Sequence, residues 1–316
     1  MRVADYVMQR LHDENCNHVF TVTGRGILYL TDSLAKNTNI ESVSVHHEQS
    51  ASYAAMSYSQ YNGNIGAALV STGCGATNAI TGLLCAWQDD IPCIFISGQN
   101  KLAETTTFTK LQIRTYGQQE ADIVSLVKPI TKYATMLVDH KDVAYEIDKA
   151  LYLAKSGRKG PVWLDIPLDI QNMRIDPDNL KRFSVEERFY GSDRSNLEDV
   201  YYTLSVMRKS KRPIVLVGSG VRTSGSIEIL HSFLSKHNLP CVFSSSATDI
   251  LDPEKVLSIG CVGAMASNRA ANFAIQNSDM VLVLGNRLST MVTGECVDKF
   301  ARGAKIIAVD IDKYEH

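Results

Sequence analysis

Short apolar runs alternate with helical stretches along the first half of the chain. Strands are predicted at HVFTVT, GAALVST, IPCIFISGQ and PVWLDIP. The third of these is continuously apolar, as in a parallel strand that is buried on both faces of its sheet. Helical spacing of apolar residues is clear at Val3, Val7 and Leu11. This alternation predicts a parallel sheet with helices on both faces.

The same pattern restarts after a charged stretch. Residues 171–195 carry many charges and show no apolar period, which is typical of a linker between domains. Beyond them, a helix is predicted at LEDVYYTLSVMRKS, and strands at PIVLVGSG, PCVFSS, DMVLVLGNR and AKIIAVDID. The predicted fold class is therefore α/β, with two doubly wound parallel-sheet domains at 1–170 and 196–316 and the linker 171–195 between them.

Composition narrows the class of protein and its partners. Of 316 residues, 45% are apolar and 21% are charged, and the formal net charge is −2. There is no basic excess that would favour nucleic acid or an anionic membrane, and no apolar run long enough to span a bilayer. The seven cysteines are scattered and never spaced C-x-x-C. We therefore expect a cytoplasmic protein with neither disulfides nor metal ligands of its own.

Glu48 stands where a predicted strand, ESVSV, leads into a helix, HHEQSASYAAMSYSQ. A carboxylate there lies at the carboxyl end of a sheet, where open α/β folds bind ligands. It could also simply complement the dipole of its own helix. Two further strands end in glycine-bearing turns, TVTGRG and LVSTGCGATN, and this favours a shared ligand crevice.

Residues 100–117 form a polar, threonine-rich stretch without a sustained period. A loop of this length inside a compact domain is usually functional or mobile. After it, Gln119 or Glu120 either reaches over the crevice or caps the following helix; the sequence leaves both readings open.

Nucleotide-binding signals are weak. The turn Gly218-Ser219-Gly220 follows a strand but does not complete G-x-G-x-x-G, and Asp310 and Asp312 either hold a ribose or end a strand. No Walker A lysine motif, H-E-x-x-H or G-x-S-x-G is present, so ATPase and hydrolase functions lose their main support.

Six ordered blocks resemble the thiamine diphosphate-dependent acetolactate synthase family, and the resemblance covers nearly the whole chain. They are HHEQSASYAAMSYSQ, STGCGATNAITGLLCAWQDDIP, FISGQ, GQQEADIVSLVKPITKY, SGRKGPVWLDIPLDIQ and TGECVDKFARGAKIIAVDID. The resemblance implies a first domain that binds the aminopyrimidine ring of thiamine diphosphate and a Rossmann-like central domain. It also implies decarboxylation and carboligation of a 2-oxo acid such as pyruvate.

In the family, the glutamate that matches Glu48 hydrogen-bonds a pyrimidine nitrogen and helps to remove the proton of the thiazolium carbon. For this role Glu48 should lie in a dry pocket, because burial favours the protonated carboxyl group. The other implied site residues are Gln119, facing the reacting carbons; Gly24, Arg25 and Gly26, near the cofactor and substrate; and Thr72, Gly73, Cys74 and Asn78, under the pyrimidine.

The sequence departs from the family pattern in several places. Arg25 and Cys74 stand where prolines are usual, and such variants look more like the branch found beside sugar-biosynthesis genes. The later segment NRLSTM lacks the acidic pair associated with FAD, which weighs against FAD as a second cofactor although the GSG turn keeps it open. The acceptor substrate and the product stay undetermined.

The family's G-D-G-S…N motif, which binds Mg²⁺ and the diphosphate, does not occur in the 316 residues. We therefore expect that the family's third domain is absent and that the chain is a truncated or split enzyme that is inactive alone. Because the family builds its site between subunits, a homodimer or homotetramer is implied. The alternatives are a non-catalytic assembly or regulatory protein that retains the fold, and a nucleotide-binding module. Retention of Glu48 and Gln119 favours the enzyme.

Overall fold

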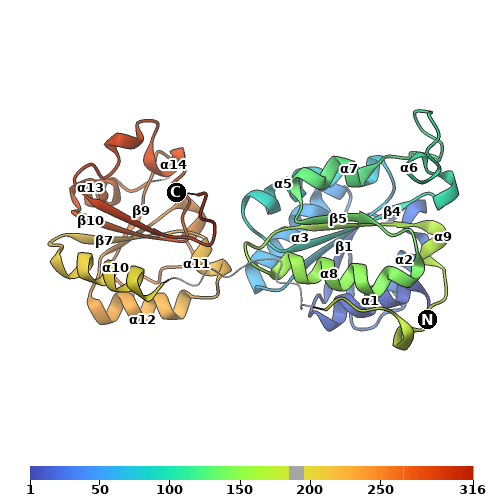
Figure 1. Ribbon diagram of the computed structural model, residues 1–316, viewed down its shortest axis with the longest axis horizontal. Helices are drawn as coiled ribbons and strands as arrows, with labels where there is room; N and C mark the ends of the chain where they lie inside the picture. Colours follow the sequence, from blue (N-terminus) through green and yellow to red (C-terminus); the bar gives the residue numbers. More distant parts are fainter. Residues whose placement is uncertain (185–195, 266, 316) are drawn as a thin grey trace. The chain divides into compact units, whose positions relative to one another are not determined.

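The computed structural model describes residues 1–184, 196–265 and 267–315. The chain divides into two compact units, Met1–Gly191 and Ser192–His316. Both are α/β, and Figure 1 colours the first from blue to green and the second from yellow to red. No helix in the described ranges is long and apolar enough to cross a membrane.

The first unit is built on a six-stranded parallel sheet with the order β2-β1-β3-β4-β6-β5. Its apolar central strands, β3 and β4, are buried along their whole length. The strands are β1 (His18–Thr21), β2 (Glu41–Ser44), β3 (Gly66–Val70), β4 (Cys93–Gln99), β5 (Tyr133–Met136) and β6 (Val162–Pro167). The helices are α1 (Val3–Asp13), α2 (Leu28–Lys36), α3 (Glu48–Asn62), α4 (Cys74–Asn78), α5 (Ile80–Gln88), α6 (Thr106–Thr109), α7 (Ile123–Val127), α8 (Val143–Lys155) and α9 (Leu168–Gln171).

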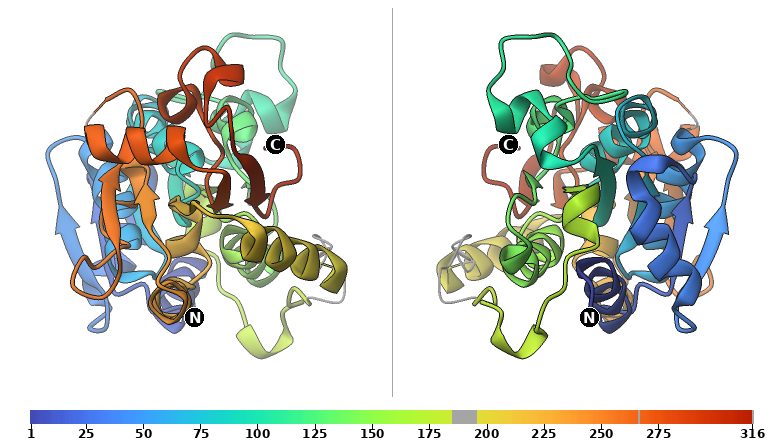
Figure 2. Two further views of the ribbon diagram at one scale, coloured as in Figure 1. Left: turned by 90° about the vertical axis from the view of Figure 1, so that its left-hand side faces the viewer. Right: turned by 90° about the vertical axis from the view of Figure 1, so that its right-hand side faces the viewer.

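Helices cover both faces of this sheet (Figures 1 and 2). On one face, α1, α2 and α8 pack in one apolar cluster with the sheet, and on the other α3, α5 and α7 form a second cluster. The second cluster contains the stacked rings of Phe95 and Trp163, whose centroids lie 5.3 Å apart. Each face of a buried parallel sheet needs such a cover, so the continuous apolar runs of the sequence are accounted for.

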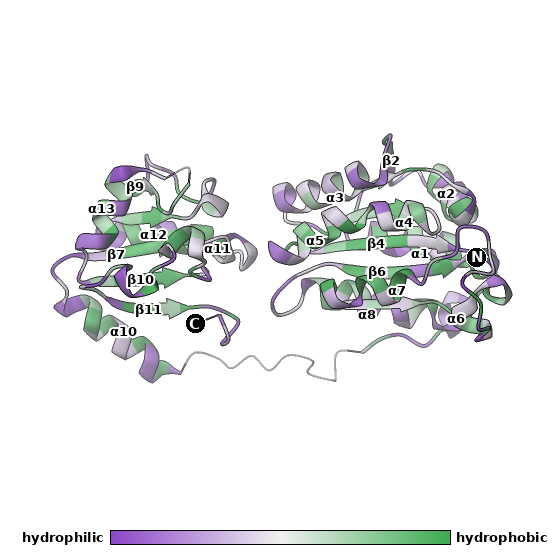
Figure 3. Cartoon of the chain, turned by 90° about the horizontal axis from the view of Figure 1, so that it is seen from above, coloured by the Kyte–Doolittle hydropathy of each residue, from purple (hydrophilic) through white to green (hydrophobic). Residues whose placement is uncertain are grey.

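The second unit has a five-stranded parallel sheet with the order β11-β10-β7-β8-β9. Helices α10 and α12 lie on one side of this sheet and α13 on the other, and Figure 3 shows hydrophobic colour along β7 and β10. The strands are β7 (Pro213–Val217), β8 (Cys241–Phe243), β9 (Ser258–Cys261), β10 (Met280–Leu284) and β11 (Lys305–Val309). The helices are α10 (Leu197–Lys209), α11 (Gly220–Thr223), α12 (Ile227–His237), α13 (Arg269–Asn277) and α14 (Thr290–Thr293).

The predicted fold class, two parallel-sheet α/β domains, is confirmed. Of the predicted linker, residues 171–184 are described and residues 185–195 lie outside the described ranges. The described part follows the surface of the first unit: the Ile175 N–H donates to the Met1 carbonyl at 2.9 Å, and Ile175 itself is buried.

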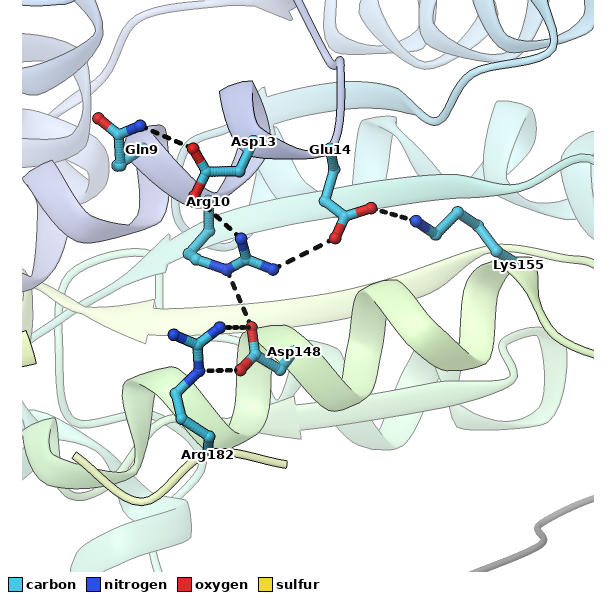
Figure 4. A network of polar contacts seen from close by, with 7 residues as sticks. All are labelled: Gln9, Arg10, Asp13, Glu14, Asp148, Lys155 and Arg182. Atoms are coloured by element: carbon cyan, nitrogen blue, oxygen red, sulfur yellow. Dashed lines mark hydrogen bonds and ion pairs between the residues drawn. The ribbon is translucent and has the colours of Figure 1, made fainter. Parts of the chain in front are cut away.

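An ion-pair network also holds this segment (Figure 4). The carboxylate of Asp148, on α8, accepts hydrogen bonds from Arg10 at 2.9 Å and from Arg182. Arg10 in turn pairs with Asp13 at 3.0 Å and with Glu14 at 3.2 Å. Asp148 is largely buried and binds both arginines, so this cluster connects the chain after β6 to helices α1 and α8 of the first unit.

Candidate active site

The turns after β1 and β3 and the end of β4 meet at one edge of the first sheet. These strands are neighbours and run parallel, so their carboxyl ends lie together. A pocket of about 360 Å³ opens there. Its lining residues come from these strand ends and turns, from the starts of α3 and α9, and from the segment before α7: Thr23, Gly24, Arg25, Gly26, Glu48, Ser71, Thr72, Cys74, Gly75, Asn78, Gln99, Asn100, Gln118, Gln119 and Leu168.

The structure brings together nearly all the residues that the sequence singled out. Glu48 and Gln119 line the pocket, as do Gly24, Arg25, Gly26, Thr72, Cys74 and Asn78. Gly73 is not a lining residue. It instead lies against the Gln119 backbone, where a Cβ would be 1.7 Å from the carbonyl oxygen, and its φ is +60°. A side chain at this position would therefore push apart two walls of the pocket.

Glu48 is the first residue of α3, as the sequence predicts. The preceding residue, His47, caps the helix by accepting the Gln49 N–H at 3.1 Å. The Asn78 side-chain amide donates to Glu48 Oε2 at 2.9 Å. On the other oxygen, a Cβ added to Gly75 would lie 3.1 Å from Oε1. Asn78 thus holds one carboxylate oxygen while the absence of a side chain at Gly75 leaves space beside the other.

The expectation of a dry pocket around Glu48 is wrong for the chain by itself. Its side chain is only half-buried, because the pocket faces outward from the sheet edge. The small apolar residues of α3, such as Ala51 and Ala55, pack inward and are fully buried. They cover the sheet and not the carboxylate.

Sequence reasoning missed Gln99 and Asn100, which follow directly at the end of β4. The Gln99 side-chain oxygen accepts the Asn100 N–H at 3.1 Å, and the Asn100 side chain donates to the Gln118 carbonyl at 3.0 Å. The Gln99 amide donates at 3.1 Å to Asp165, a fully buried carboxyl group on β6. The signal available in the sequence was their place at the end of a buried apolar strand, which is an edge where parallel sheets bind ligands.

Asp165 lies beneath this row of amides. Its second oxygen accepts the Ser97 hydroxyl at 2.6 Å, and Ser97 accepts the indole N–H of Trp163 at 2.8 Å. Burial raises the pKa of Asp165 to about 7, although the bonds from Ser97 and Gln99 act in the opposite direction. The floor of the pocket therefore rests on a buried carboxyl group.

Comparison with known proteins adds the family. Residues 1–126 match the family model described as thiamine pyrophosphate enzyme, N-terminal TPP binding domain, and residues 202–316 match the model of the thiamine pyrophosphate enzyme central domain. The chain belongs to the thiamine pyrophosphate enzymes. The order of the two matched domains agrees with the two units of the structure.

Relatives of this thiamine pyrophosphate enzyme chain include three proteins named acetolactate synthase large subunit. The one from Lactococcus lactis is 30% identical over 309 residues, 98% of this chain and 52% of the relative. The one from Haemophilus influenzae is 32% identical over 312 residues, which are 98% of this chain and 52% of the relative. The one from Corynebacterium glutamicum is 32% identical over 317 residues, which are 100% of this chain and 49% of the relative. The predicted resemblance is confirmed, and the chain spans about half the length of the curated relatives it matches.

Glu120 neither reaches over the pocket nor caps the following helix, the two roles that the sequence left open. Its carboxylate accepts backbone N–H groups from Thr106 at 2.5 Å and from Tyr116 at 2.7 Å, and so closes the loop between them. Helix α7 is capped by Asp122, which accepts the Ser125 N–H at 3.2 Å. The loop is partly ordered by α6 and by this carboxylate.

In the second unit, the glycines of the turn Gly218-Ser219-Gly220 pack closely against a neighbouring turn. The Gly220 N–H donates to the Gly285 carbonyl at 3.0 Å, and a Cβ on Gly218 would lie 2.1 Å from the same oxygen. The Asp310 carboxylate accepts the Asp312 N–H at 3.0 Å in the turn after β11. Within the described ranges, no three His, Cys, Asp or Glu side chains are grouped so as to hold a metal ion.

Proposed function

We propose that this chain supplies the pyrimidine-binding site of a thiamine diphosphate-dependent decarboxylase or carboligase that acts on a 2-oxo acid such as pyruvate. One observation carries the proposal: the Glu48 carboxylate, oriented by Asn78, lies in the same pocket as Gln119 and the glycine turn at Gly24 and Gly26. These groups come from four separate segments of the sequence. A scaffold without chemistry has no need to bring them together.

The pocket residues fit the aminopyrimidine. A volume of about 360 Å³ is in the range of small-ligand sites. Gly75 has no side chain beside Glu48 Oε1, where a Cβ would lie only 3.1 Å from that oxygen, so this residue does not block the approach of a flat ring. Asn78 occupies Oε2, so one oxygen is fixed and the other is left for a ring nitrogen.

When bound, thiamine diphosphate supplies a nucleophilic carbon and takes up the electron pair released as a 2-oxo acid loses carbon dioxide. Glu48 would share a proton with a pyrimidine nitrogen of the bound cofactor, and Asn78 would hold the Glu48 carboxylate in place through Oε2. Gln119 provides an amide at the substrate side of the pocket. Thr72, Gly73 and Cys74 belong to the turn that would lie under the ring.

The remaining cofactor contacts are proposed to come from other polypeptide segments. In the resembling family, the diphosphate and Mg²⁺ are held by a G-D-G-S…N motif, which residues 1–316 do not contain. The site would be completed across subunits, in a homodimer or homotetramer. FAD binding in the second unit stays a prediction. The segment NRLSTM counts against it, because it lacks the acidic pair associated with FAD.

A binding experiment with the pyrimidine alone tests the role of Glu48. The full chain is titrated with 4-amino-5-hydroxymethyl-2-methylpyrimidine and followed by ¹H–¹⁵N NMR. We expect shifts at the amides of Glu48, Gly75 and Asn78, and their loss in Glu48→Gln. The matched control is Glu41→Gln, which changes the same residue type at the opposite end of β2.

Equal shifts in wild type and Glu48→Gln would contradict the assignment. If the pyrimidine causes no amide shifts but FAD or ADP shifts the amides of residues 218–220, the result would favour the nucleotide-binding alternative. If none of these ligands causes shifts, the result would favour an assembly or regulatory protein. In the complete enzyme, Glu48→Gln should slow exchange of the thiazolium proton by about a hundred- to ten-thousand-fold.

A further inference from the structure

Arg25 places a positive charge in the pocket on a rigid turn. The 3₁₀ turn Arg25–Ile27 follows β1, and both flanking glycines are pressed against the turn after β3. A Cβ on Gly24 would lie 2.3 Å from Ser71 Oγ, and one on Gly26 would lie 1.9 Å from Thr72 Oγ1. The backbone is therefore fixed, and the Arg25 side chain lines the pocket.

The charge of Arg25 has no carboxylate partner among the described residues. Its Nη1 donates to the side-chain oxygen of Gln118 at 2.9 Å, and Gln118 is a neutral amide. No carboxylate oxygen in the described ranges lies within 4.0 Å of this guanidinium. By contrast, Arg2 and Arg10 in the same unit pair with carboxylates at 2.7 and 2.9 Å.

The support for Arg25 is itself held in place. The Gln118 carbonyl accepts the Asn100 side chain at 3.0 Å, and Asn100 is fixed by Gln99. An arginine has five N–H donors in a planar fork, and one of those of Arg25 is taken up by Gln118. No hydrogen bond to a described residue takes up the others, and Arg25 is exposed, so they are open to a ligand from solution; a carboxylate or phosphate matches their geometry.

The reaction restricts which anion this is. The carboxylate of the 2-oxo acid loses its charge as carbon dioxide leaves, so a cation bound to it would stabilise the starting state more than the transition state and slow the step. A group that keeps its charge throughout brings no such penalty. We propose that Arg25 binds an oxyanion group, carboxylate or phosphate, that the acceptor substrate retains during carboligation.

This inference rests on the proposed function for the identity of the ligand, but the anion site can be tested without it. The full chain is titrated with inorganic phosphate and with acetate, and the amides of Gly24, Gly26 and Gln118 are followed by NMR. We expect Arg25→Gln to weaken binding at least about tenfold, and Arg25→Lys to retain part of it.

The charge-matched control is Lys36→Gln. It removes one positive charge at the far end of α2, the helix that follows the turn, about 14 Å along its axis. The control should bind both anions as wild type does. Equal affinities in wild type and Arg25→Gln would overturn the proposal.

The second arm uses the complete thiamine diphosphate-loaded enzyme with pyruvate as donor. Acceptors are compared in pairs that differ in charge: glyoxylate with glycolaldehyde, and glyceraldehyde 3-phosphate with glyceraldehyde. In Arg25→Gln, the ratio of kcat/KM for the charged over the neutral acceptor should fall at least about tenfold for one pair, which identifies the anion as carboxylate or phosphate. An unchanged ratio in both pairs would overturn the proposal. A wild-type enzyme that joins no acceptor would contradict the proposed function, and the anion titration would then decide on Arg25.

Discussion

Asp165 is a carboxyl group in a place where its ionisation is costly, and replacing it by asparagine tests this directly. It is 1% exposed, and within the described ranges no Lys, Arg or His lies within 4.0 Å of its oxygens. The nearby Asp122 adds a like charge. Burial, the largest of these influences, raises the pKa of Asp165 from 3.8 to about 7.

The sign of the effect follows from the direction of the shift. A carboxyl group whose pKa is raised in the folded state favours folding fully below its unfolded pKa, and this contribution is lost as the pH rises through the folded pKa. From 3.8 to about 7 is about three pH units. At about 1.4 kcal/mol per unit, the wild type should lose about 4 kcal/mol of unfolding free energy, relative to Asp165→Asn, between pH 4 and pH 8.

Asparagine also turns one acceptor into a donor, facing either Ser97 or the Gln99 amide. This lost hydrogen bond costs about 1–3 kcal/mol at every pH, so it lowers the stability of the variant without changing the slope. The pH dependence of the difference is therefore the quantity to measure.

The assay is urea unfolding between pH 4 and pH 8.5, followed by tryptophan fluorescence. Both tryptophans, Trp87 and Trp163, lie in the first unit, so the signal reports the unit that contains Asp165. Asp5→Asn is the control. Its hydrogen bond with Arg2 lowers the pKa of Asp5 to about 2, so its contribution is present above pH 3.8 and lost only below this range. Parallel pH profiles for wild type and Asp165→Asn would refute the argument.

Two further predictions concern the same unit. Gly73→Ala should destabilise it by at least about 2 kcal/mol in the same urea assay, because φ is +60° and a Cβ would lie 1.7 Å from the carbonyl oxygen opposite; Gly63→Ala, with a similar φ but nothing within 4 Å, should cost less. Asp148→Ala should cost about 1.5–3 kcal/mol, the range for a hydrogen bond to a charged group, because Arg10 loses its interhelical carboxylate but keeps Asp13 and Glu14. It should also speed tryptic cleavage at Arg182, and an unchanged cleavage rate would contradict the role of the network.

The fold was predictable where a buried strand is an uninterrupted run of apolar residues in the sequence. The strands β4 and β10 are such runs, and their positions agree with the prediction. The strand β9, Ser258–Cys261, was missed. It is short and half-exposed, and its pairing with β8 is irregular next to Gly260, so neither alternation nor a continuous run marks it.

Only those site residues that belong to local sequence motifs could be predicted. Glycine turns and a strand-to-helix junction placed Glu48 and Gly24, but the bond between Asn78 and Glu48 joins residues 30 positions apart and has no local signature. The amides of Gln99 and Asn100 enter the pocket because β4 lies beside β3, a fact of sheet order. Strand order is settled by packing over the whole unit, and no single segment contains it.

Asp165 and Glu48 stand at the same edge of one sheet in opposite surroundings. Asp165 is already dry, whereas Glu48 is half-buried and held by one neutral amide. A ring that covers Glu48 would complete an enclosure that the sheet edge alone does not give to this carboxylate, whereas the fold itself encloses Asp165.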